Sequence, residues 1–217
     1  MARDAEMATA GYDKSPFDWY VEPDWTTDVM IAAERAIDGG DSWGKVWDPA
    51  CGRGNLLRTF GRNGHPVWAS DIEFRGYAGR GMFQELDFVG GIDFVRSAAP
   101  KTRFSIATNP PYSYIKGISE AFVRRALELA TEKVAMLLPI KWQGSQVRHR
   151  LFTEFPPTRI WILSERPSMP PGAMVEALGD KAFKRGKVDY MWVVWDVANP
   201  TAVTEWRTIA PREKAVV

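Results

Sequence analysis

Cysteine is nearly absent from this sequence, since Cys51 is the single one among 217 residues. An intrachain disulfide is therefore excluded, and one cysteine with two histidines makes no zinc-binding pattern. No apolar run approaches the length of a membrane span. The first 14 residues carry charges where a signal peptide needs an apolar core. We therefore expect a cytoplasmic protein with a disordered leader over residues 1–16, no metal and no membrane partner.

A large excess of charge of one sign is also missing, because 28 Lys and Arg face 27 Asp and Glu. If these charges were spread evenly over the surface, a net charge of +1 would attract a nucleic acid only weakly. Residues 141–187, however, carry an excess of five positive charges. Such a bias is typical of a solvated surface, and contact with phosphate groups is the alternative. The basic residues are Lys141, Arg148, Arg150, Arg159, Arg166, Lys181, Lys184, Arg185 and Lys187, against Glu154, Glu165, Glu176 and Asp180.

The apolar residues predict alternating strands and helices. A chain of 217 residues with 45% hydrophobic residues can bury one substantial core. Alternation of this kind predicts an α/β fold with a parallel sheet covered on both faces, and the last two strands read as a hairpin. The expected strands are 45–48, 66–70, 103–108, 133–139, 159–163, 188–196 and 204–206, and the expected helices are 26–37, 55–61, 118–129 and 141–152.

A stiff corner follows the strand-like run 103–108. It reads Asn109-Pro110-Pro111-Tyr112, and each proline holds φ at about −65°. The Asn109 amide oxygen and the Pro110 carbonyl could each accept one N–H of a flat amine, while the Tyr112 ring stacks on it. Two such acceptors favour a pyramidal nitrogen and stabilise developing positive charge. The alternative is a proline-rich turn that only closes a loop.

Aspartates end two other predicted strands. Asp48 precedes a turn that contains Gly52 and Gly54, and Asp71 follows Gly52 by 19 residues, where nucleotide-binding α/β folds place a ribose-binding carboxylate. Leu57 stands where a dinucleotide fingerprint has its third Gly or Ala, which argues against a pyrophosphate site. Ordinary strand-end capping is the alternative for both aspartates.

In this order, Asp48-Pro49-Ala50-Cys51-Gly52-Arg53-Gly54, Asp71, Asp87-Phe88 and Asn109-Pro110-Pro111-Tyr112 resemble the S-adenosylmethionine-dependent amino-methyltransferases. The lead-in Tyr20-Val21-Glu22-Pro23 resembles the first motif of DNA adenine-N6 methyltransferases of the gamma arrangement, which commonly have Thr in place of Glu22. Residues 189–195 resemble the terminal hairpin of phage-type adenine methylases. The resemblance spans about residues 17–200.

The resemblance implies a seven-stranded Rossmann-like sheet with an antiparallel last strand, in one catalytic domain over residues 17–210 with a basic loop insertion at about 164–187. The implied cofactor is S-adenosylmethionine, with contacts from Tyr20, Pro23, Asp48, Pro49, Ala50, Cys51, Gly52, Gly54, Asp71, Ile72, Asp87, Phe88 and Asn109. The implied catalytic residues are Asn109, Pro110, Pro111 and Tyr112. The implied DNA contacts are Tyr112, Lys141, Arg166, Lys181, Lys184 and Arg185.

The implied activity is methylation of adenine N6 in DNA, most simply double-stranded DNA with the target base flipped out. Such enzymes with tight sequence choice mostly carry a separate recognition domain, and the sequence leaves no room for one. We therefore expect relaxed or short sequence preference and a phage or prophage origin, in a bacterial or phage-infected cell. Enzymes that methylate glutamine side chains or RNA share the corner motif and remain an alternative. A non-catalytic subunit of the same fold is disfavoured because Asp48, Asp71 and Asn109 are all present.

Overall fold

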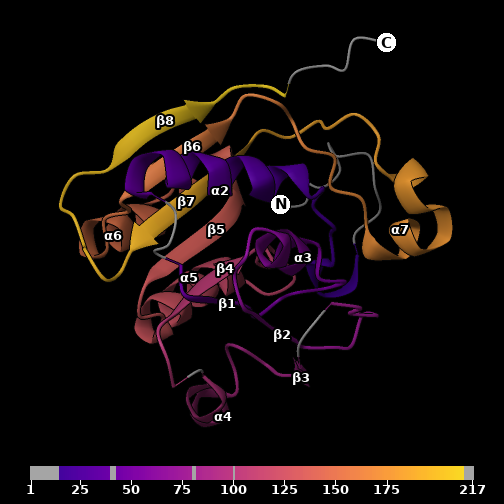
Figure 1. The fold of residues 1–217 in the computed structure, drawn as a ribbon, viewed down its shortest axis with the longest axis horizontal. Helices are drawn as coiled ribbons and strands as arrows, with labels where there is room; N and C mark the ends of the chain where they lie inside the picture. Colours follow the sequence, from indigo (N-terminus) through magenta and orange to yellow (C-terminus); the bar gives the residue numbers. More distant parts are fainter. Residues whose placement is uncertain (1–14, 40–42, 80–81, 100, 213–217) are drawn as a thin grey trace.

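The computed structural model describes residues 15–39, 43–79, 82–99 and 101–212, which form one sheet with helices on both faces (Figure 1). The eight strands lie in the order β3-β2-β1-β4-β5-β7-β6-β8, and β7 is antiparallel to both of its neighbours. This confirms the predicted Rossmann-like α/β class. The strands are β1 (Lys45–Asp48), β2 (Val67–Asp71), β3 (Phe83–Glu85), β4 (Phe104–Thr108), β5 (Lys133–Pro139), β6 (Arg159–Leu163), β7 (Tyr190–Asp196) and β8 (Glu205–Ile209).

The helices cover the sheet in two layers. Helices α2 and α3 pack on one face, and α5 and α6 pack on the other. The α-helices are α2 (Trp25–Asp38), α3 (Asn55–Arg62), α4 (Ile92–Ala98), α5 (Ile118–Leu129), α6 (Gln146–Glu154) and α7 (Gly172–Leu178). The short 3₁₀ turns are η1 (Pro16–Asp18), η2 (Ile140–Gln143) and η3 (Gly179–Ala182). Among the described residues, no helix is both long and apolar enough to cross a bilayer.

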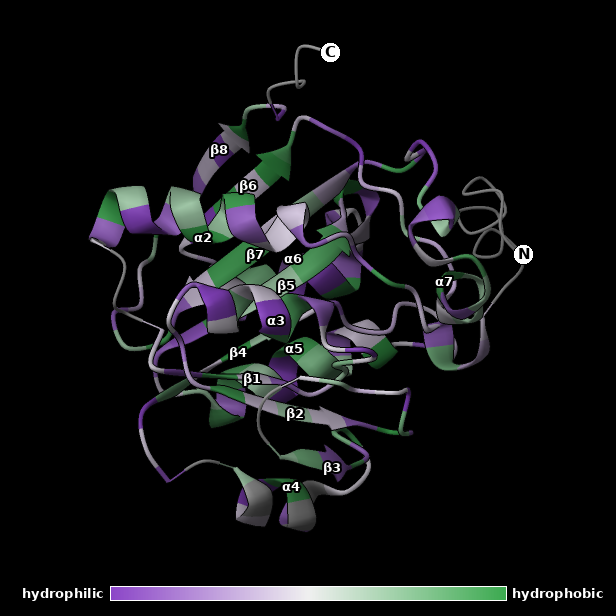
Figure 2. Ribbon diagram, turned by 45° about the vertical axis from the view of Figure 1, so that its right-hand side comes forward, coloured by the Kyte–Doolittle hydropathy of each residue, from purple (hydrophilic) through white to green (hydrophobic). Residues whose placement is uncertain are grey.

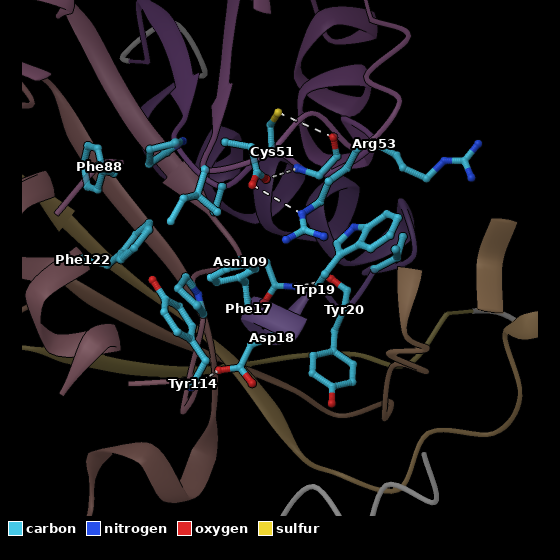
Figure 3. A pocket seen from close by; sticks show the side chains of 18 of the residues that line it. Phe17, Asp18, Trp19, Tyr20, Cys51, Arg53, Phe88, Asn109, Tyr114 and Phe122 are labelled. Atoms are coloured by element: carbon cyan, nitrogen blue, oxygen red, sulfur yellow. Dashed lines mark hydrogen bonds and ion pairs between the residues drawn. The ribbon is translucent and has the colours of Figure 1, made fainter. Parts of the chain in front are cut away.

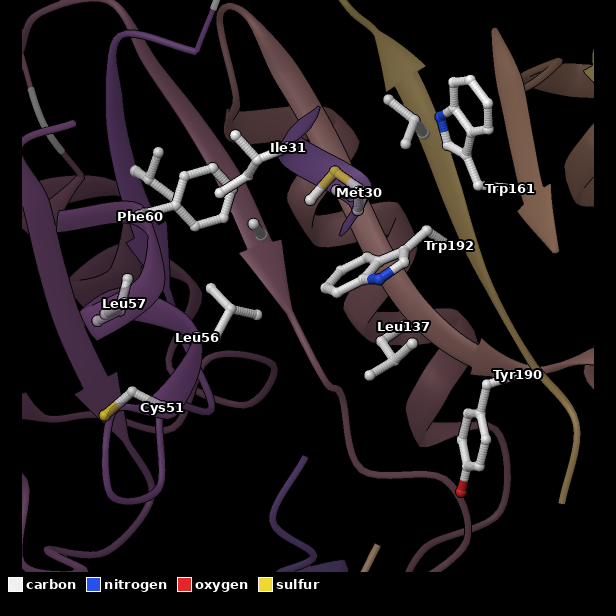
Figure 4. Packing of buried hydrophobic residues seen from close by; sticks show 14 of the residues in the cluster. Met30, Ile31, Cys51, Leu56, Leu57, Phe60, Leu137, Trp161, Tyr190 and Trp192 are labelled. Atoms are coloured by element: carbon white, nitrogen blue, oxygen red, sulfur yellow. The ribbon is translucent and has the colours of Figure 1, made fainter. Parts of the chain in front are cut away.

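Two hydrophobic clusters fill the space between the sheet and these layers. Along β5 the side chains alternate, so that Leu137 joins the cluster under α2 and α3 while Met136 joins the cluster under α5. Figure 2 shows β5 and β7 as hydrophobic strands enclosed by the helices. In Figure 4, Met30 of α2 lies next to Trp192 of β7, and Phe60 of α3 lies beside Ile31, on the face of the sheet that α2 and α3 cover. These central strands are apolar on both sides because both faces are covered.

The predicted end of the sheet is wrong in two respects. The predicted hairpin does not form: β8 pairs in parallel with β6 instead of with β7. The last strand is consequently not the antiparallel one, and the sheet has eight strands instead of seven. The reason is that β5 and β6 already occupy both edges of β7, which leaves no backbone groups there for β8 to pair with.

A buried ionic cluster fastens α2 to the sheet. Lys133 Nζ of β5 lies 2.7 Å from Glu34 Oε2 of α2, and both side chains are fully buried. Arg159 of β6 donates to both oxygens of the same carboxylate, from Nε at 2.7 Å and Nη2 at 2.6 Å. Trp161 Nε1 adds a further hydrogen bond of 2.8 Å. This bonding satisfies the charges, which would otherwise be costly to bury.

The segment 164–187, predicted as a basic loop, is partly helical and partly paired. It contains α7 and η3, and residues 170–172 lie beside residues 19–21, which precede α2. Val21 N donates to Pro170 O at 2.9 Å, and Gly172 N donates to Trp19 O at 3.0 Å. A side chain on Gly172 would collide with the Trp19 ring. The first part of the predicted loop is therefore built into the body of the fold. Of the predicted leader, residues 1–14 lie outside the described residues.

Candidate active site at the carboxyl ends of the strands

A cavity opens at the carboxyl ends of β1, β2 and β4, with about 640 Å³ of space that is partly open to solvent (Figure 3). This edge of the sheet is where open α/β folds bind ligands. The walls come from residues 49–53 after β1, 71–72 at the end of β2, 86–88 after β3, and the Asn109 corner after β4. Residues 17–22 close it from the other side.

Most of the predicted cofactor residues line this cavity. They are Tyr20, Pro49, Ala50, Cys51, Gly52, Asp71, Ile72, Asp87, Phe88 and Asn109. Pro23, Asp48 and Gly54 are not among the lining residues. Asp48 lies buried behind the turn, where it accepts the Ala50 amide at 3.0 Å. Gly54 has a φ of +85°, and a side chain there would meet the Tyr77 ring. Asp48 and Gly54 therefore shape the turn after β1 and are not part of the cavity wall.

The end of β2 is bonded to the turn after β1. Asp71 Oδ2 accepts the backbone N–H of Gly52 at 2.8 Å, and Arg75 Nε lies 3.5 Å from Asp71 Oδ1. Burial raises the pKa of Asp71, while the Gly52 amide and Arg75 act in the opposite direction. The Arg75 guanidinium lies over the Trp19 ring at 4.7 Å. These donors hold the Asp71 carboxylate in place at the end of β2, on the wall of the cavity.

Asp87 also has a local structural bond, because its Oδ1 accepts the amides of Val89 at 3.1 Å and Gly90 at 2.8 Å. It therefore caps its own turn, as strand-end aspartates often do, and it still lines the cavity. Phe88 is buried beside it and lies 5.0 Å from the Phe122 ring of α5. An aromatic wall thus closes the end of the cavity near β3.

The Asn109 side chain is held from two directions. Its Nδ2 donates to Glu22 Oε2 at 3.1 Å and to Tyr20 O at 3.3 Å. Its Oδ1 accepts a short hydrogen bond from the Tyr112 hydroxyl, which also lies 3.0 Å from Leu137 O. Asn109 is partly exposed and lines the cavity. The amide that the sequence singles out therefore reaches the cavity with its orientation fixed by neighbouring residues.

Tyr112 does not lie as predicted. We expected its ring to stack on a substrate, but it is not among the residues that line the cavity. Its hydroxyl bonds inward, its ring centroid lies 6.5 Å from that of Tyr190, and burial raises the pKa of the phenol well above its ordinary value. A buried tyrosine hydroxyl needs a polar partner, and Leu137 O supplies one. The ring that lines the cavity from this corner is Tyr114, which makes an edge contact with Phe17 at 5.5 Å.

Asp18 is a site residue that the sequence patterns did not reveal. Its carboxylate accepts the backbone N–H of Tyr112 at 3.0 Å and of Tyr114 at 2.7 Å, together with the amide and hydroxyl of Ser113. Phe17 and Asp18 both have left-handed φ values, 50° and 54°, which cost a non-glycine residue energy. The strained turn is held by these bonds. No motif in residues 15–18 signals such a contact, which joins residues 94 to 96 positions apart.

Two buried carboxyl groups beside the cavity have raised pKa values, and one buried donor of the cavity wall lacks a partner among the described residues. Burial, with the charge of Asp24, raises the pKa of Glu22 to about 7 against the lowering effect of its hydrogen bonds. Burial also raises the pKa of Asp48, with Glu22 and Asp71 adding to the effect. Trp19 Nε1 is buried with no hydrogen-bond partner among the described residues. A ligand that bears both a cation and a carboxylate would match these groups.

The predicted DNA-contacting residues lie away from the cavity walls. Lys181, Lys184 and Arg185 are exposed and have no ion-pair partner among the residues that the structure describes. Arg166, by contrast, pairs with Asp189 at 2.6 Å. Arg185 also borders a second hollow, beside Tyr190. These cations follow α7, and residues 170–172 at the start of that helix bond to residues 19–21, which line the cavity.

No protein-family model matches the sequence, and no curated protein matches it. Solved structures do match. A protein assigned as a class I S-adenosylmethionine-dependent methyltransferase from Listeria monocytogenes gives a TM-score of 0.53 at 15% identity, over 86% of this chain and 65% of its own. The modification subunit assigned to a type I restriction enzyme of Vibrio vulnificus gives 0.58 at 14% identity, over 96% and 50%. A protein assigned as an RNA methyltransferase from Pyrococcus horikoshii gives 0.56 at 16% identity, over 90% and 99%.

At these identities the likeness shows the fold, which is that of S-adenosylmethionine-dependent methyltransferases. The chain spans 65% of the Listeria protein and 50% of the Vibrio subunit. One fold serves different substrates in these proteins, so the substrate has to be argued from the site.

Proposed function

We propose that this chain transfers a methyl group from S-adenosylmethionine to the exocyclic N6 amine of adenine in DNA. The observation that carries the proposal is the position of Asn109, whose fixed amide lines the same cavity as the strand-end carboxylate of Asp71. A cofactor pocket and an amine-binding corner therefore share one space. The likeness in fold to methyltransferases supports the same reading.

Several residues fit the proposed cofactor. Asp71 would hold the ribose hydroxyls, and Phe88 and Asp87 would hold the adenine ring and its amine. Trp19 Nε1, which lacks a partner among the described residues, would donate to the carboxylate of the methionine part. The carboxyl groups of Glu22 and the buried Asp48 would lie near its positive charges. When bound, the cofactor supplies an activated methyl group on a sulfonium sulfur.

Asn109 and Pro110 act on the target amine. The amide oxygen of Asn109, through the lone pair that does not take the Tyr112 hydroxyl, and the carbonyl of Pro110 would each accept one N–H, which favours a pyramidal nitrogen with its lone pair toward the methyl group. Fixed dipoles of this kind stabilise the positive charge that develops on nitrogen without a strong base. Orientation of the two reactants supplies a further part of the rate, up to about 7–11 kcal/mol in favourable cases.

DNA is the favoured substrate for two reasons. Lys181, Lys184 and Arg185 are exposed cations available for phosphate groups, and the Vibrio neighbour is assigned as a restriction-modification subunit. Adenine within a duplex has to be flipped out to reach the cavity, at a cost of a few kcal/mol. We propose relaxed or short sequence preference and a phage or prophage origin. The Pyrococcus neighbour makes RNA the second candidate.

The test incubates the purified protein with tritiated S-adenosylmethionine and, in parallel, with duplex DNA, single-stranded DNA, RNA and a protein extract. Nucleoside and amino-acid analysis then identifies the labelled product. We expect N6-methyladenine from DNA, scattered over many sequence contexts. Label in RNA or glutamine alone would replace DNA by that substrate, and absence of label from every sample would overturn the proposed activity.

A further inference from the structure

Glu22 stands where the resembling methyltransferases commonly have Thr, and it contacts the residue proposed to bind the target amine. Its side chain is buried at 7% exposure, and its Oε2 accepts a hydrogen bond of 3.1 Å from Asn109 Nδ2. Its own backbone carbonyl accepts the Asn55 side chain at 3.0 Å, which anchors the residue to the start of α3. The contact therefore joins two segments that are fixed independently, 87 positions apart in the chain.

The surroundings of Asn109 decide which end of its amide faces the target. Tyr20 O is a backbone carbonyl and can only accept, and an ionised Glu22 can only accept as well. Both therefore require the NH2 end of the amide, and Oδ1 lies on the opposite side, where one of its two lone pairs accepts from the Tyr112 hydroxyl. A neutral Glu22 could donate its own proton to an amide oxygen, and Tyr20 O would then be the one acceptor of the pair that still requires the NH2 end.

The charge of Glu22 has a second effect through the same bond. A carboxylate that accepts from an amide N–H polarises the amide and makes its oxygen a stronger acceptor. The low polarity of a buried site increases this effect. An oxygen polarised in this way gives more stabilisation to an amine that becomes positive as it is methylated.

Several titratable groups face Glu22. Asp24 lies on the same segment, Asp48 at the end of β1, and Cys51 in the turn after β1, while Tyr112 faces it from the corner after β4. Burial is the main cause of the raised pKa of Glu22, about 7, and the charge of Asp24 adds to it. The ionisation of Glu22 therefore falls in the range where an enzyme operates.

We infer that the ionised Glu22 carboxylate is a positioning residue, which fixes and polarises the Asn109 amide so that its oxygen receives the target amine. This inference rests on the proposed function for its catalytic consequence. The orientation of the Asn109 amide by Glu22 is a property of the protein alone.

The first test needs neither substrate nor cofactor. In protein labelled with ¹⁵N-asparagine, the side-chain NH2 signals of Asn109, assigned by comparison with Asn109→Ala, are followed from pH 5.5 to 9. We expect them to titrate with a midpoint near 7 in the wild type and to lose this transition in Glu22→Gln. Asp24→Asn is the matched control, because it removes a nearby carboxylate that does not touch Asn109, and the transition should persist. A pH-independent wild-type signal, or an unchanged transition in Glu22→Gln, would overturn the inference.

The second test is single-turnover methyl transfer with saturating cofactor. The wild-type rate should fall about tenfold per pH unit below the midpoint, as expected for one required ionisation. Glu22→Gln should be at least tenfold slower at pH 8.5 and nearly independent of pH. Wild-type rates and profile in Glu22→Gln would contradict the inference. Failure of the wild type to methylate any substrate would overturn the proposed function instead, while the NMR titration still decides whether Glu22 orients Asn109.

Discussion

Asp18 Oδ2 accepts the backbone N–H of Tyr114 at 2.7 Å, and through this contact a strained turn near the start of the described chain holds the corner that follows β4. The same carboxylate takes the amides of Tyr112 and Ser113. Three successive N–H groups that converge on one anion form a compact and charge-assisted arrangement. The stiffness of the corner thus comes from its two prolines and also from a residue outside it.

We predict that Asp18→Ala loosens this corner. Three amides lose a charged acceptor, which should lower the free energy of unfolding by about 2–3 kcal/mol and speed hydrogen exchange at residues 112–114. Mass spectrometry of deuterium uptake would measure this directly. Asp196→Ala is the control, since among the described residues Asp196 accepts the backbone amide and the side-chain amide of Asn199 alone, at the carboxyl end of β7 and away from this corner. Equal protection of residues 112–114 in the wild type and Asp18→Ala would show that the carboxylate does not hold the corner.

Asn109→Ala should separate binding from transfer. Loss of one positioned acceptor is expected to reduce the rate of methyl transfer about 10²–10³-fold, while the affinity for S-adenosylmethionine changes only a few-fold. Calorimetry gives the affinity, and single-turnover assays give the rate. Asn63→Ala serves as control, because Asn63 bonds within α3 to Thr59 O. Undiminished turnover in Asn109→Ala would remove this residue from the mechanism.

Glu34→Gln should destabilise the fold strongly. The substitution leaves Lys133 and Arg159 buried without their shared carboxylate, at a cost of about 3–5 kcal/mol. Urea unfolding at pH 7 would show this cost, and Glu85→Gln, at an exposed position, should change the free energy of unfolding by less than about 0.5 kcal/mol.

The same residue predicts acid sensitivity. Burial raises the pKa of Glu34, but the hydrogen bond from Arg159 and the charge of Lys133 outweigh burial, so the net pKa is lowered from 4.5. A lowered pKa contributes stability above the unfolded-state pKa, and this stability is lost as the pH falls through the folded-state pKa. The difference between the wild type and Glu34→Gln should therefore shrink at acid pH. A constant difference from pH 7 to pH 3 would contradict this reading.

Glu22 should act on stability with the opposite sign. Its pKa is raised from 4.5 to about 7, so its favourable contribution is present below pH 4.5 and is lost as the pH rises toward 7. A shift of this size corresponds to roughly 3 kcal/mol. Relative to the wild type, Glu22→Gln should therefore gain stability between pH 5 and pH 8. Thermal or urea unfolding of the wild type and Glu22→Gln at pH 5 and pH 8 would test this prediction. An equal difference in the free energy of unfolding at the two pH values would contradict it.

The exposed cations after α7 should contribute to DNA affinity through phosphate groups. Replacing Lys181, Lys184 and Arg185 by Gln should weaken binding to all sequences alike. The slope of log K against log salt should fall by about 0.9 for each phosphate group that the variant no longer neutralises. Arg35→Gln and Lys101→Gln, at exposed positions outside this segment, are the controls. An unchanged salt slope in the triple variant would exclude this segment from the interface.

The strand ends were predictable, because parallel strands deliver their carboxyl ends to one edge and the sequence marks those ends. Asp71 and Asn109 were placed in this way, and both line the cavity. Asp18 was not predictable, since its role depends on a left-handed turn and on contacts with residues far along the chain. The Tyr112 ring shows a different limit: a motif places an aromatic residue after two prolines, but a hydrogen bond to Leu137 O decides where the ring points.

The end of the sheet was mispredicted for a topological reason. Consecutive strands usually lie next to each other, which favours a hairpin from strands that follow in sequence. Here β7 enters between β5 and β6, so neither of its edges is open to β8. Strand spacing alone carries no sign of such an insertion.

The central place of β7 also has a consequence during synthesis. Residues 190–196 leave the ribosome late, yet their strand separates β5 from β6 in the finished sheet. Until it arrives, each of those two strands keeps an open edge that any other extended chain could join. A nascent or truncated chain that ends before residue 190 should therefore aggregate and depend on chaperones, whereas one that includes β7 and β8 should not.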